Sequence, residues 1–420
     1  MNMDSSKQAA LGEIFLRFRA ACQSEKYREY RLGLIASVLH GYFLLNNKSR
    51  LSLVFSAIKK ILKTPVVHYP DAVSETAIYY SIERNDYVEL IDLVREDLIA
   101  GGRAVKRPYL LTLEEQTSSL RDFWIAVRSA LKIQQLSAGG FLDGFYYFAC
   151  YCYLIKGFLW LERNHRVFPK AAIFFNSSNF PESMLCEYFR VRGSKTYSLQ
   201  HGMYLDYKVL PFDVINYSNV MADILLCWGH ASKADIECFY KKNNFEMGFE
   251  CKVAGYPRRL SCTNTPDVRD TVLVLLPRKI YLKQCSQLLA LLHEVKGERF
   301  IIKLHPSLAE NEEITAGCLR LKAPIQGGTL SECLAGKQYK AVIGFNSSSI
   351  LEALPSAARA LVYISGTDEF ELKGLDGFST SDELSVLLKS KGSVSLVELF
   401  NYYFEQPRYQ SCLSEYERTK

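Results

Sequence analysis

The chain lacks the features that identify disulfide-rich, zinc-binding and membrane-spanning proteins. Its twelve cysteines are scattered over 420 residues, and Cys150 and Cys152 form a CxC pair instead of the CxxC knuckles of structural zinc sites. The longest apolar stretch, residues 145–161, is interrupted by Lys156 and falls short of the roughly 20 residues that a membrane-spanning helix needs. We therefore expect buried thiols in a reducing compartment and a buried or interfacial helix.

The sequence also lacks the short motifs of several large enzyme classes. It contains no Walker loop, no GxSxG elbow, no HExxH pair and no DxD pair after a strand. The first 22 residues have neither the apolar core nor the small-residue cleavage site of a signal peptide. These absences favour a cytoplasmic location and a reaction that uses no metal ion and no cofactor.

Positive charge is concentrated at the front of the chain. Residues 1–66 hold eleven Lys and Arg against four Asp and Glu, whereas the whole chain has a net charge of +6. Residues 30–45 and 51–63 of this segment carry apolar groups at helical spacing. Such basic helices can rest peripherally on anionic lipid, or they can be a solvated face of the first domain. No nucleic-acid recognition motif accompanies the charge, so a nucleic-acid partner is not expected.

Hydrophobic residues (48%) and charged residues (23%) are present in the proportions of a soluble globular protein, and the length indicates two to three domains. Strand-like and helix-like stretches alternate from about residue 170, with a polar linker at 258–270. Because such alternation produces parallel sheets, we expect an α/β fold of two Rossmann-like lobes facing each other across a cleft. The expected parts are a mainly helical N-terminal part at 1–165, one lobe at 166–262 and a second lobe at 263–420.

Polar residues follow one strand of the second lobe as an asparagine and three serines: Asn346, Ser347, Ser348 and Ser349. They lie between a strand and a helix, where unpaired N–H groups favour an anion. One serine would be enough to cap the helix, so three in a row favour phosphate binding. Glu352, one turn further on, is either an acceptor for ribose hydroxyls or a surface acid.

His305 follows another strand of this lobe, close to Lys303. An imidazole with its ordinary pKa of about 6.5 can donate to a phosphate, whose charge would raise that pKa. Pro306 fixes the turn and removes a competing N–H donor. We expect these three residues to bind phosphate and His305 to take part in catalysis; the alternative is a histidine that only satisfies a local backbone group.

His201 stands at a strand end of the first lobe, directly before Gly202. A neutral imidazole there is a suitable general base for a hydroxyl nucleophile. Asp206 either orients this ring or is itself the base, and loop bracing is the alternative role for His201. Four polar residues at the same strand ends are expected to bind the acceptor: Asn176, Ser177, Ser178 and Gln200.

With these residues assembled, the chain resembles bacterial glycosyltransferases of the two-Rossmann-lobe (GT-B) type. More narrowly, "KLHPS" at 303–307 followed by "FNSSS" at 345–349 is similar to the HP and Ser motifs of CMP-sugar transferases, which move sialic acid or Kdo onto surface polysaccharides. In that family the His and Ser residues hold the nucleotide phosphate, which implies this role for His305 and Ser347–Ser349. The resemblance covers roughly residues 170–365.

The first lobe departs from this pattern, because "LQHG" at 199–202 stands where the family commonly carries an acidic motif with the base. An HG motif paired with a later HP is similar to teichoic-acid polymerases that use CDP-glycerol or CDP-ribitol. The resemblance implies a transferase at the inner face of the cytoplasmic membrane that adds a CMP-activated sugar to a glycan or lipid-linked glycan of capsule or lipopolysaccharide. A CDP-polyol phosphotransferase, a UDP-sugar transferase and a catalytically silent scaffold subunit are the alternatives.

Overall fold

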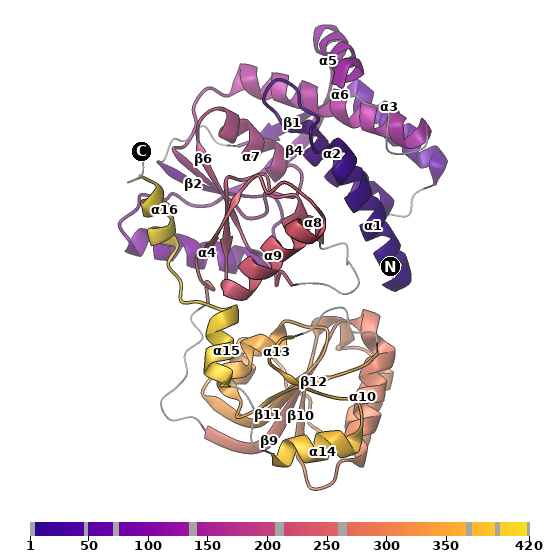
Figure 1. The fold of residues 1–420 in the computed structure, drawn as a ribbon, viewed down its shortest axis with the longest axis vertical. Coiled ribbons are helices and arrows are strands. Elements are labelled where there is room, and N and C mark those ends of the chain that lie inside the picture. Colours follow the sequence, from indigo (N-terminus) through magenta and orange to yellow (C-terminus); the bar gives the residue numbers. More distant parts are fainter. Residues whose placement is uncertain are drawn as a thin grey trace. The chain divides into compact units, whose positions relative to one another are not determined.

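The computed structural model describes residues 5–45, 49–69, 75–133, 141–205, 214–258, 267–366, 372–390 and 395–417. The chain forms two compact units (Figure 1). The described residues up to Arg258 and from Gln406 onward belong to the N-terminal unit, and those between 267 and 405 form the C-terminal unit. The last residues of the chain therefore return to the unit in which the chain begins.

A six-stranded parallel sheet forms the centre of the N-terminal unit. Its strand order is β3-β2-β5-β6-β7-β8. The strands are β2 (Thr76–Tyr80), β3 (Tyr109–Leu110), β5 (Ala171–Phe174), β6 (Lys195–Leu199), β7 (Ile224–Cys227) and β8 (Glu250–Val253). Every residue of β5 and β7 is buried, as is typical of parallel strands covered on both faces.

Two groups of helices surround this sheet. The first group alternates with the strands or closes the chain: α4 (Asn85–Ala100), α7 (Glu182–Val191), α8 (Ile215–Ser218), α9 (His230–Lys242) and α16 (Tyr409–Glu417). The second group comprises α1 (Ser5–Cys22), α2 (Leu32–Leu45), α3 (Arg50–Leu62), α5 (Leu120–Ile133) and α6 (Phe141–Asn164). A small antiparallel sheet of β1 (Lys63–His68) and β4 (Thr112–Thr117) accompanies the second group.

Helix α6 is the centre of the second group. It contacts α2, α3, α5 and β1, and thirteen of its 24 residues are buried. This confirms the buried helix expected at 145–161. No helix in the described part of the chain has the length and apolar character needed to cross a membrane.

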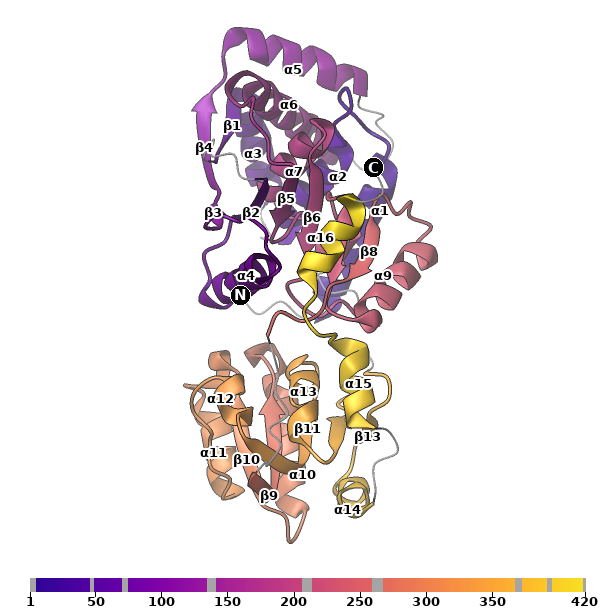
Figure 2. The same cartoon turned by 90° about the vertical axis from the view of Figure 1, so that its left-hand side faces the viewer.

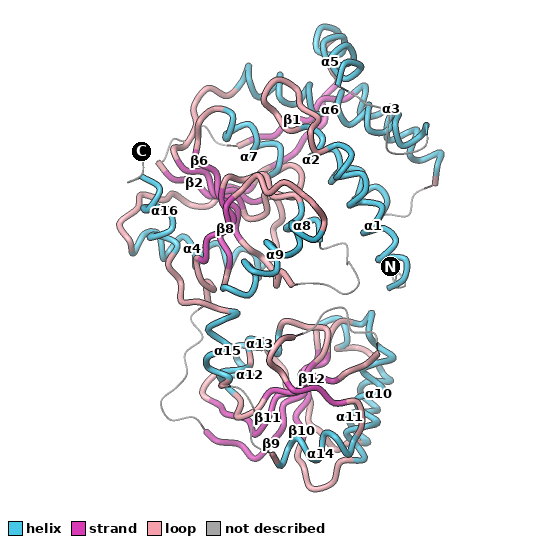
Figure 3. The backbone as a smooth tube through the Cα atoms, in the orientation of Figure 1, coloured by secondary structure: helices cyan, strands magenta, loops and turns pink. Residues whose placement is uncertain are grey.

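The C-terminal unit contains a five-stranded parallel sheet with the order β10-β9-β11-β12-β13 (Figure 3). Its strands are β9 (Asp267–Leu276), β10 (Phe300–Leu304), β11 (Lys337–Gly344), β12 (Ala360–Tyr363) and β13 (Asp376–Phe378). Its helices are α10 (Leu282–Glu294), α11 (Glu312–Arg320), α12 (Leu330–Leu334), α13 (Ser349–Glu352), α14 (Ser381–Lys389) and α15 (Leu396–Tyr403). Both units thus have the expected Rossmann-like α/β architecture.

Four elements differ from the expectation. β2 and β3 come from the part expected to be mainly helical, and they extend the sheet of the N-terminal unit beyond β5. β9 begins at Asp267, inside the expected linker at 258–270. The helix expected after Asn346 is only the single turn of α13 followed by a 3-10 turn, and Pro355 within that turn cannot continue an α-helix because it has no N–H.

Candidate functional site

Three neighbouring strands of the C-terminal unit end close together. β10 and β9 end as partners at Leu304 and Leu276, and β11 ends at Gly344 beside them. His305 follows the first of these ends and the segment 346–349 follows the last, so the two are separated by the width of β9, roughly 10 Å for two strand spacings. The structure therefore brings both expected phosphate-binding segments to the carboxyl edge of one sheet, where open α/β sheets bind ligands.

The His305 ring is held through one of its two nitrogens. The backbone N–H of Ser307 donates to Nδ1 at 3.1 Å, and Ser307 Oγ lies 2.9 Å from the same atom. Because a backbone N–H can only donate, Nδ1 is the acceptor and the neutral ring carries its proton on Nε2. Within the described chain Nε2 has no hydrogen-bond partner, so His305 offers a donor at this edge. Pro306 is exposed and begins the 3-10 turn that holds Ser307.

The surroundings of His305 are positively charged. Burial and the Arg278 guanidinium lower the pKa of His305, so the ring is neutral near pH 7 in the absence of an anion. Arg278 was not among the residues expected from the sequence, although it follows β9 and the same strand-end rule would have found it. Lys303 donates to the Gly328 carbonyl, so one of its three N–H groups is already used.

The Ser347 and Ser349 hydroxyls bond locally, and the Ser348 hydroxyl does not cap the helix that follows. Ser347 Oγ lies 2.8 Å from Ser349 Oγ and accepts from the Ser349 N–H at 3.3 Å, and Ser348 makes no side-chain capping hydrogen bond. Asn346 is buried with a φ of 44°, a left-handed conformation that Asn tolerates better than most residues. Because α13 has a single turn, hydroxyl groups and not a helix dipole are what this segment offers an anion. Glu352 ends α13 and is half-buried.

In the N-terminal unit, the ring of His201 is bonded through both nitrogens. Asn176 Nδ2 lies 3.1 Å from Nε2, and Tyr204 Oη lies 3.1 Å from Nδ1. The Ser178 N–H donates to Asn176 Oδ1, which leaves Asn176 Nδ2 as the donor to Nε2 and places the ring proton on Nδ1. Burial lowers the pKa of His201 to about 4, so the ring is neutral at physiological pH. A general-base role for His201 requires Asn176 to release Nε2.

The four side chains expected to bind the acceptor are buried: Asn176, Ser177, Ser178 and Gln200. Ser178 Oγ donates to the Asn216 carbonyl at 2.7 Å, and Gln200 Nε2 donates to Ser232 Oγ at 2.8 Å. Ser177 Oγ accepts from the Met221 N–H at 3.2 Å. These bonds brace the loops after β5 and β6, so direct contact with an acceptor would require the loops to open. Asp206, the alternative base, lies outside the described residues.

Glu182 is a buried acid beside this cluster that the sequence did not single out. Its carboxylate accepts from the Asn176 N–H at 2.7 Å, and from the N–H and hydroxyl of Ser81 at 3.0 and 2.8 Å. Burial raises the pKa of Glu182 to about 8, against the opposing effect of these three donors. Glu182 thereby ties the end of β2 to the loop that positions Asn176. An acid in the first turn of a helix is common at surfaces, so no sequence signal distinguished it.

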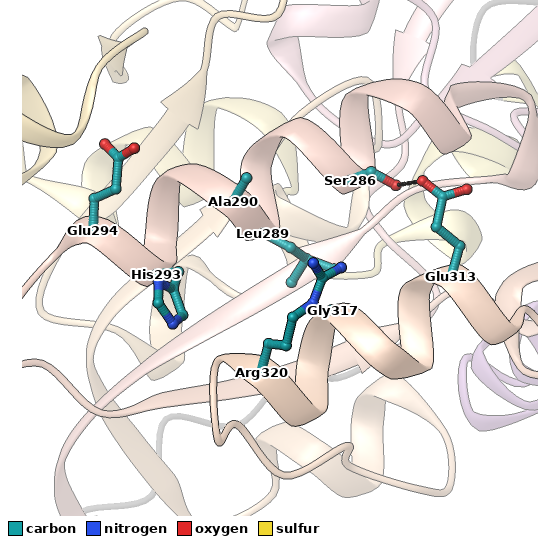
Figure 4. A pocket seen from close by; sticks show the side chains of 8 residues that line it. All are labelled: Ser286, Leu289, Ala290, His293, Glu294, Glu313, Gly317 and Arg320. Carbon is teal, nitrogen blue, oxygen red and sulfur yellow. Dashed lines mark hydrogen bonds between the residues drawn. The ribbon is translucent and has the colours of Figure 1, made fainter.

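A cavity of about 260 Å³ lies between α10 and α11 of the C-terminal unit (Figure 4). Ser286 Oγ donates to Glu313 Oε1 at 2.5 Å on one side, and His293 and Arg320 line it as well. None of the site residues expected from the sequence lines this cavity. It is therefore separate from the strand edge that carries His305.

No protein-family model and no curated protein sequence matches this chain. Similar solved structures include the lipopolysaccharide outer core galactosyltransferase WaaB, with a TM-score of 0.47, 11% identity and coverage of 82% of this chain and 99% of that one. MurG of Acinetobacter baumannii has a TM-score of 0.44, 11% identity and coverage of 83% and 100%. The wall teichoic acid polymerase TagF has a TM-score of 0.43, 12% identity and coverage of 82% and 88%. No role of any residue in this chain follows from likenesses this distant.

Proposed function

We propose that the chain is a glycosyltransferase that binds a nucleotide-activated sugar at the carboxyl edge of the C-terminal sheet. The geometry of His305 carries this proposal: Ser307 fixes Nδ1 as an acceptor, Nε2–H remains a donor, and the Arg278 guanidinium adds positive charge. A phosphate oxygen suits this combination. Its negative charge would raise the pKa of the ring, and the resulting imidazolium would stabilise charge that develops on the leaving nucleotide.

The other contacts with the nucleotide-activated sugar are assigned to residues 347–352, which lie on the other side of β9 from His305. The hydroxyls of Ser347, Ser348 and Ser349 supply further hydrogen bonds to the phosphate in this proposal, because Ser348 does not cap α13 and a hydroxyl that bonds one neighbour can still bond another group. Glu352 accepts from ribose hydroxyls in this proposal, and Lys303 contributes its charge through the N–H groups that Gly328 leaves unused.

The acceptor is assigned to the loops after β5 and β6 of the N-terminal unit. His201 takes the proton of the attacking hydroxyl once Asn176 has released Nε2, and Asp206 is the alternative base. A pKa of about 4 makes His201 a weak base, so the assignment relies on proton transfer late in the reaction, when the departing nucleotide has made the hydroxyl acidic.

The donor is proposed to be a CMP-activated sugar of the sialic acid or Kdo type, on the strength of the HP motif at His305 and the serines at 347–349. The acceptor is proposed to be a glycan or lipid-linked glycan of capsule or lipopolysaccharide at the inner face of the cytoplasmic membrane. The HG pair at His201 and Gly202 favours a second candidate, transfer of polyol phosphate from CDP-glycerol or CDP-ribitol, in which the attacked atom is phosphorus.

Nucleotide binding by calorimetry tests the donor site. We expect CMP or CDP to bind the wild-type protein, and His305→Ala to weaken binding by at least about tenfold, since a hydrogen bond to a charged group contributes about 1.5–3 kcal/mol. His305→Gln, which keeps a side-chain N–H donor, should lose less. His293→Ala, a histidine of α10 in the same unit, is the matched control and should bind normally.

Transfer from CMP-sugar, CDP-polyol and UDP-sugar donors then separates the candidates. A CMP-sugar donor used by the wild type and not by His305→Ala or His201→Ala, with unchanged melting temperatures, supports the full proposal. If only CDP-glycerol supports turnover, then the group that the enzyme transfers is a polyol phosphate and not a sugar. A folded wild-type protein that binds none of these nucleotides would be a scaffold and would end the proposal.

A further inference from the structure

Helices α3 and α5 expose large apolar side chains. The exposed residues of α3 are Leu51, Phe55, Ile58 and Leu62, and those of α5 are Leu120, Trp124 and Leu131. Their exposed fractions run from 43% to 74%, which is high for residues of this size. Because they recur every three, four or seven positions, each set forms one stripe along its helix.

Both helices bury small residues where a surface helix usually buries large ones. Ala57 of α3 and Ala126 and Ala130 of α5 are fully buried, and both helices pack on α6. Leu53 is the one large aliphatic residue of α3 that is buried. Packing within the N-terminal unit therefore does not explain the seven exposed apolar residues, and such patches mark surfaces that bind something else.

The charge around the two stripes is positive. α3 contains no acidic residue and carries three basic residues, Arg50, Lys59 and Lys60. α5 carries three more, Arg121, Arg128 and Lys132, and its only acid, Asp122, is buried in an ion pair with Arg163 at 2.5 Å. On the adjoining strand β4, Glu115 pairs with Lys59 at 2.5 Å and Glu114 pairs with His68 at 3.3 Å. Five of the six cations thus have no carboxylate partner among the described residues.

The two helices adjoin each other where one ends and the other begins. The N–H of Ser118, two residues before α5, donates to the Leu62 carbonyl of α3 at 3.1 Å. Lys156 of α6 donates to the Ile61 carbonyl and to Ser118 Oγ at 2.6 and 2.8 Å, and so fixes both ends on the same support. Figure 2 shows α5 lying along α6 at the edge of the N-terminal unit.

We propose that α3 and α5 together form a docking surface for an anionic lipid bilayer. The proposal refines the membrane location given above and does not depend on the donor or on catalysis. The surface is also smaller than the one expected from the basic helical stretches at 30–45 and 51–63. Among their described residues, α2 is buried through Leu32, Ile35 and Val38, whereas α3 exposes the apolar side chains named above. α5 lies outside the basic segment and was not expected to take part.

A bilayer fits this surface better than a second copy of the chain. Apolar side chains, a tryptophan and surrounding Lys and Arg are the composition of helices that lie in a lipid interface. A symmetric dimer through the same face would place the cations of one copy against those of the other, whereas an anionic leaflet complements them.

Vesicle co-sedimentation of the full chain tests the proposal. We expect wild-type protein to bind phosphatidylglycerol vesicles, to bind phosphatidylcholine vesicles weakly, and to be released by salt. Phe55→Ser with Trp124→Ser should reduce binding at least about tenfold, and Arg121→Gln with Arg128→Gln should reduce it and weaken its salt dependence. Leu319→Ser with Val386→Ser, two equally exposed apolar positions of the C-terminal unit, is the matched control and should bind normally.

Tryptophan fluorescence gives an independent readout of the same surface. Trp124 is 61% exposed, so its emission should shift to the blue on anionic vesicles, and Trp124→Phe should remove the shift while binding persists. Wild-type protein that ignores anionic vesicles, or that binds them equally well after the Phe55→Ser and Trp124→Ser changes, would overturn the proposal. A dimer in ultracentrifugation that these changes dissolve would assign the surface to self-association. His305→Ala should bind vesicles normally, so failure of the donor site and failure of the docking surface are distinguishable.

Discussion

At the scale of single residues, His305 and His201 show that partners decide what an imidazole can do. His305 follows β10 directly and His201 stands two residues after β6, and the strand pattern predicts both placements from the sequence. His305 has Nδ1 bound to Ser307 two residues away, whereas His201 is bonded to Asn176, 25 residues away on the loop after the neighbouring strand. The local partner could be anticipated from "HPS". The distant one depends on strand order, which one sequence does not reveal.

The pH dependence of nucleotide affinity follows from the setting of His305. Burial and Arg278 lower the pKa of the free ring, and a bound phosphate raises it, so binding should be accompanied by proton uptake. We expect affinity for CMP to increase several-fold as pH falls from about 8 to about 6.5, close to the ordinary imidazole value. Calorimetry in buffers of different ionisation enthalpy measures both the affinity and the proton uptake.

The matched variant for this measurement is His305→Gln. The phosphate of CMP itself titrates near pH 6, and both proteins share that contribution. The difference between wild type and His305→Gln therefore isolates the imidazole. Equal pH dependence in the two proteins would show that His305 does not meet the phosphate.

At the scale of elements, long periodic stretches were predictable and short ones were not. The alternation of strands and helices expected from about residue 170 is confirmed by α7, α10 and the strands that flank them, whose periodicity and end signals are present in the sequence. β3 has two residues, and β2 (Thr76–Tyr80) is a short run without polar alternation, which does not distinguish a buried strand from a segment of buried helix. β2 pairs with the edge of β5 and β3 pairs with the edge of β2, and these edges exist only in the folded sheet.

A substitution of Lys156 tests how one buried side chain stabilises the end of a helix. In the sequence it only interrupts an apolar run, but in the structure its ammonium ends α3 by donating to the Lys60 and Ile61 carbonyls at 3.1 and 2.6 Å. Lys156→Met should lower the free energy of unfolding by about 1–3 kcal/mol at pH 7, because buried carbonyls lose their donor. Urea denaturation measures this, with Lys241→Met at an exposed position of α9 as the control expected to change little.

The stability of the folded protein depends on pH at Lys156 in the direction opposite to that of a lysine whose charged form is stabilised by folding. Burial lowers the pKa of Lys156 to about 8, so between that value and about 10 the unfolded chain binds more protons here than the folded chain. The stability of wild type relative to Lys156→Met should therefore rise by about 2 kcal/mol over this range. A constant or falling difference would mean that the ammonium remains fully charged in the folded protein.

At the scale of the whole molecule, the chain closes on itself through its last residues. After α15 of the C-terminal unit, the segment from Gln406 returns to the N-terminal unit. The Arg408 N–H donates to the Ala254 carbonyl at 2.8 Å, and the buried Tyr409 hydroxyl donates to the Gly255 carbonyl at 2.7 Å. The second lobe expected at 263–420 included this segment, because amphipathic helices at the end of a chain carry no signal of which sheet they join.

A substitution of Gly255 tests whether the segment from Gln406 is held on the N-terminal unit. It has a φ of +91°, and a Cβ there would lie 2.1 Å from the Gln406 carbonyl oxygen, so Gly255→Ala is opposed by backbone conformation and by contact with the returning segment. Gly193 is the matched control: its φ is +89°, and nothing lies within 4 Å of an added Cβ. Gly193→Ala should cost only the strain of a left-handed residue, about 1–2 kcal/mol.

Gly255→Ala should cost clearly more than Gly193→Ala in urea denaturation, and it should also release the end of the chain. We expect faster hydrogen exchange at residues 408–413 in Gly255→Ala and unchanged exchange there in Gly193→Ala, because only the first substitution collides with the returning segment. The alternative outcome is that both variants lose the same free energy of unfolding and that hydrogen exchange at residues 408–413 is unchanged in both. The returning segment would then make room for the added methyl group without a loss of stability. In that case its hydrogen bonds to Ala254 and Gly255 do not hold the C-terminus on the N-terminal unit.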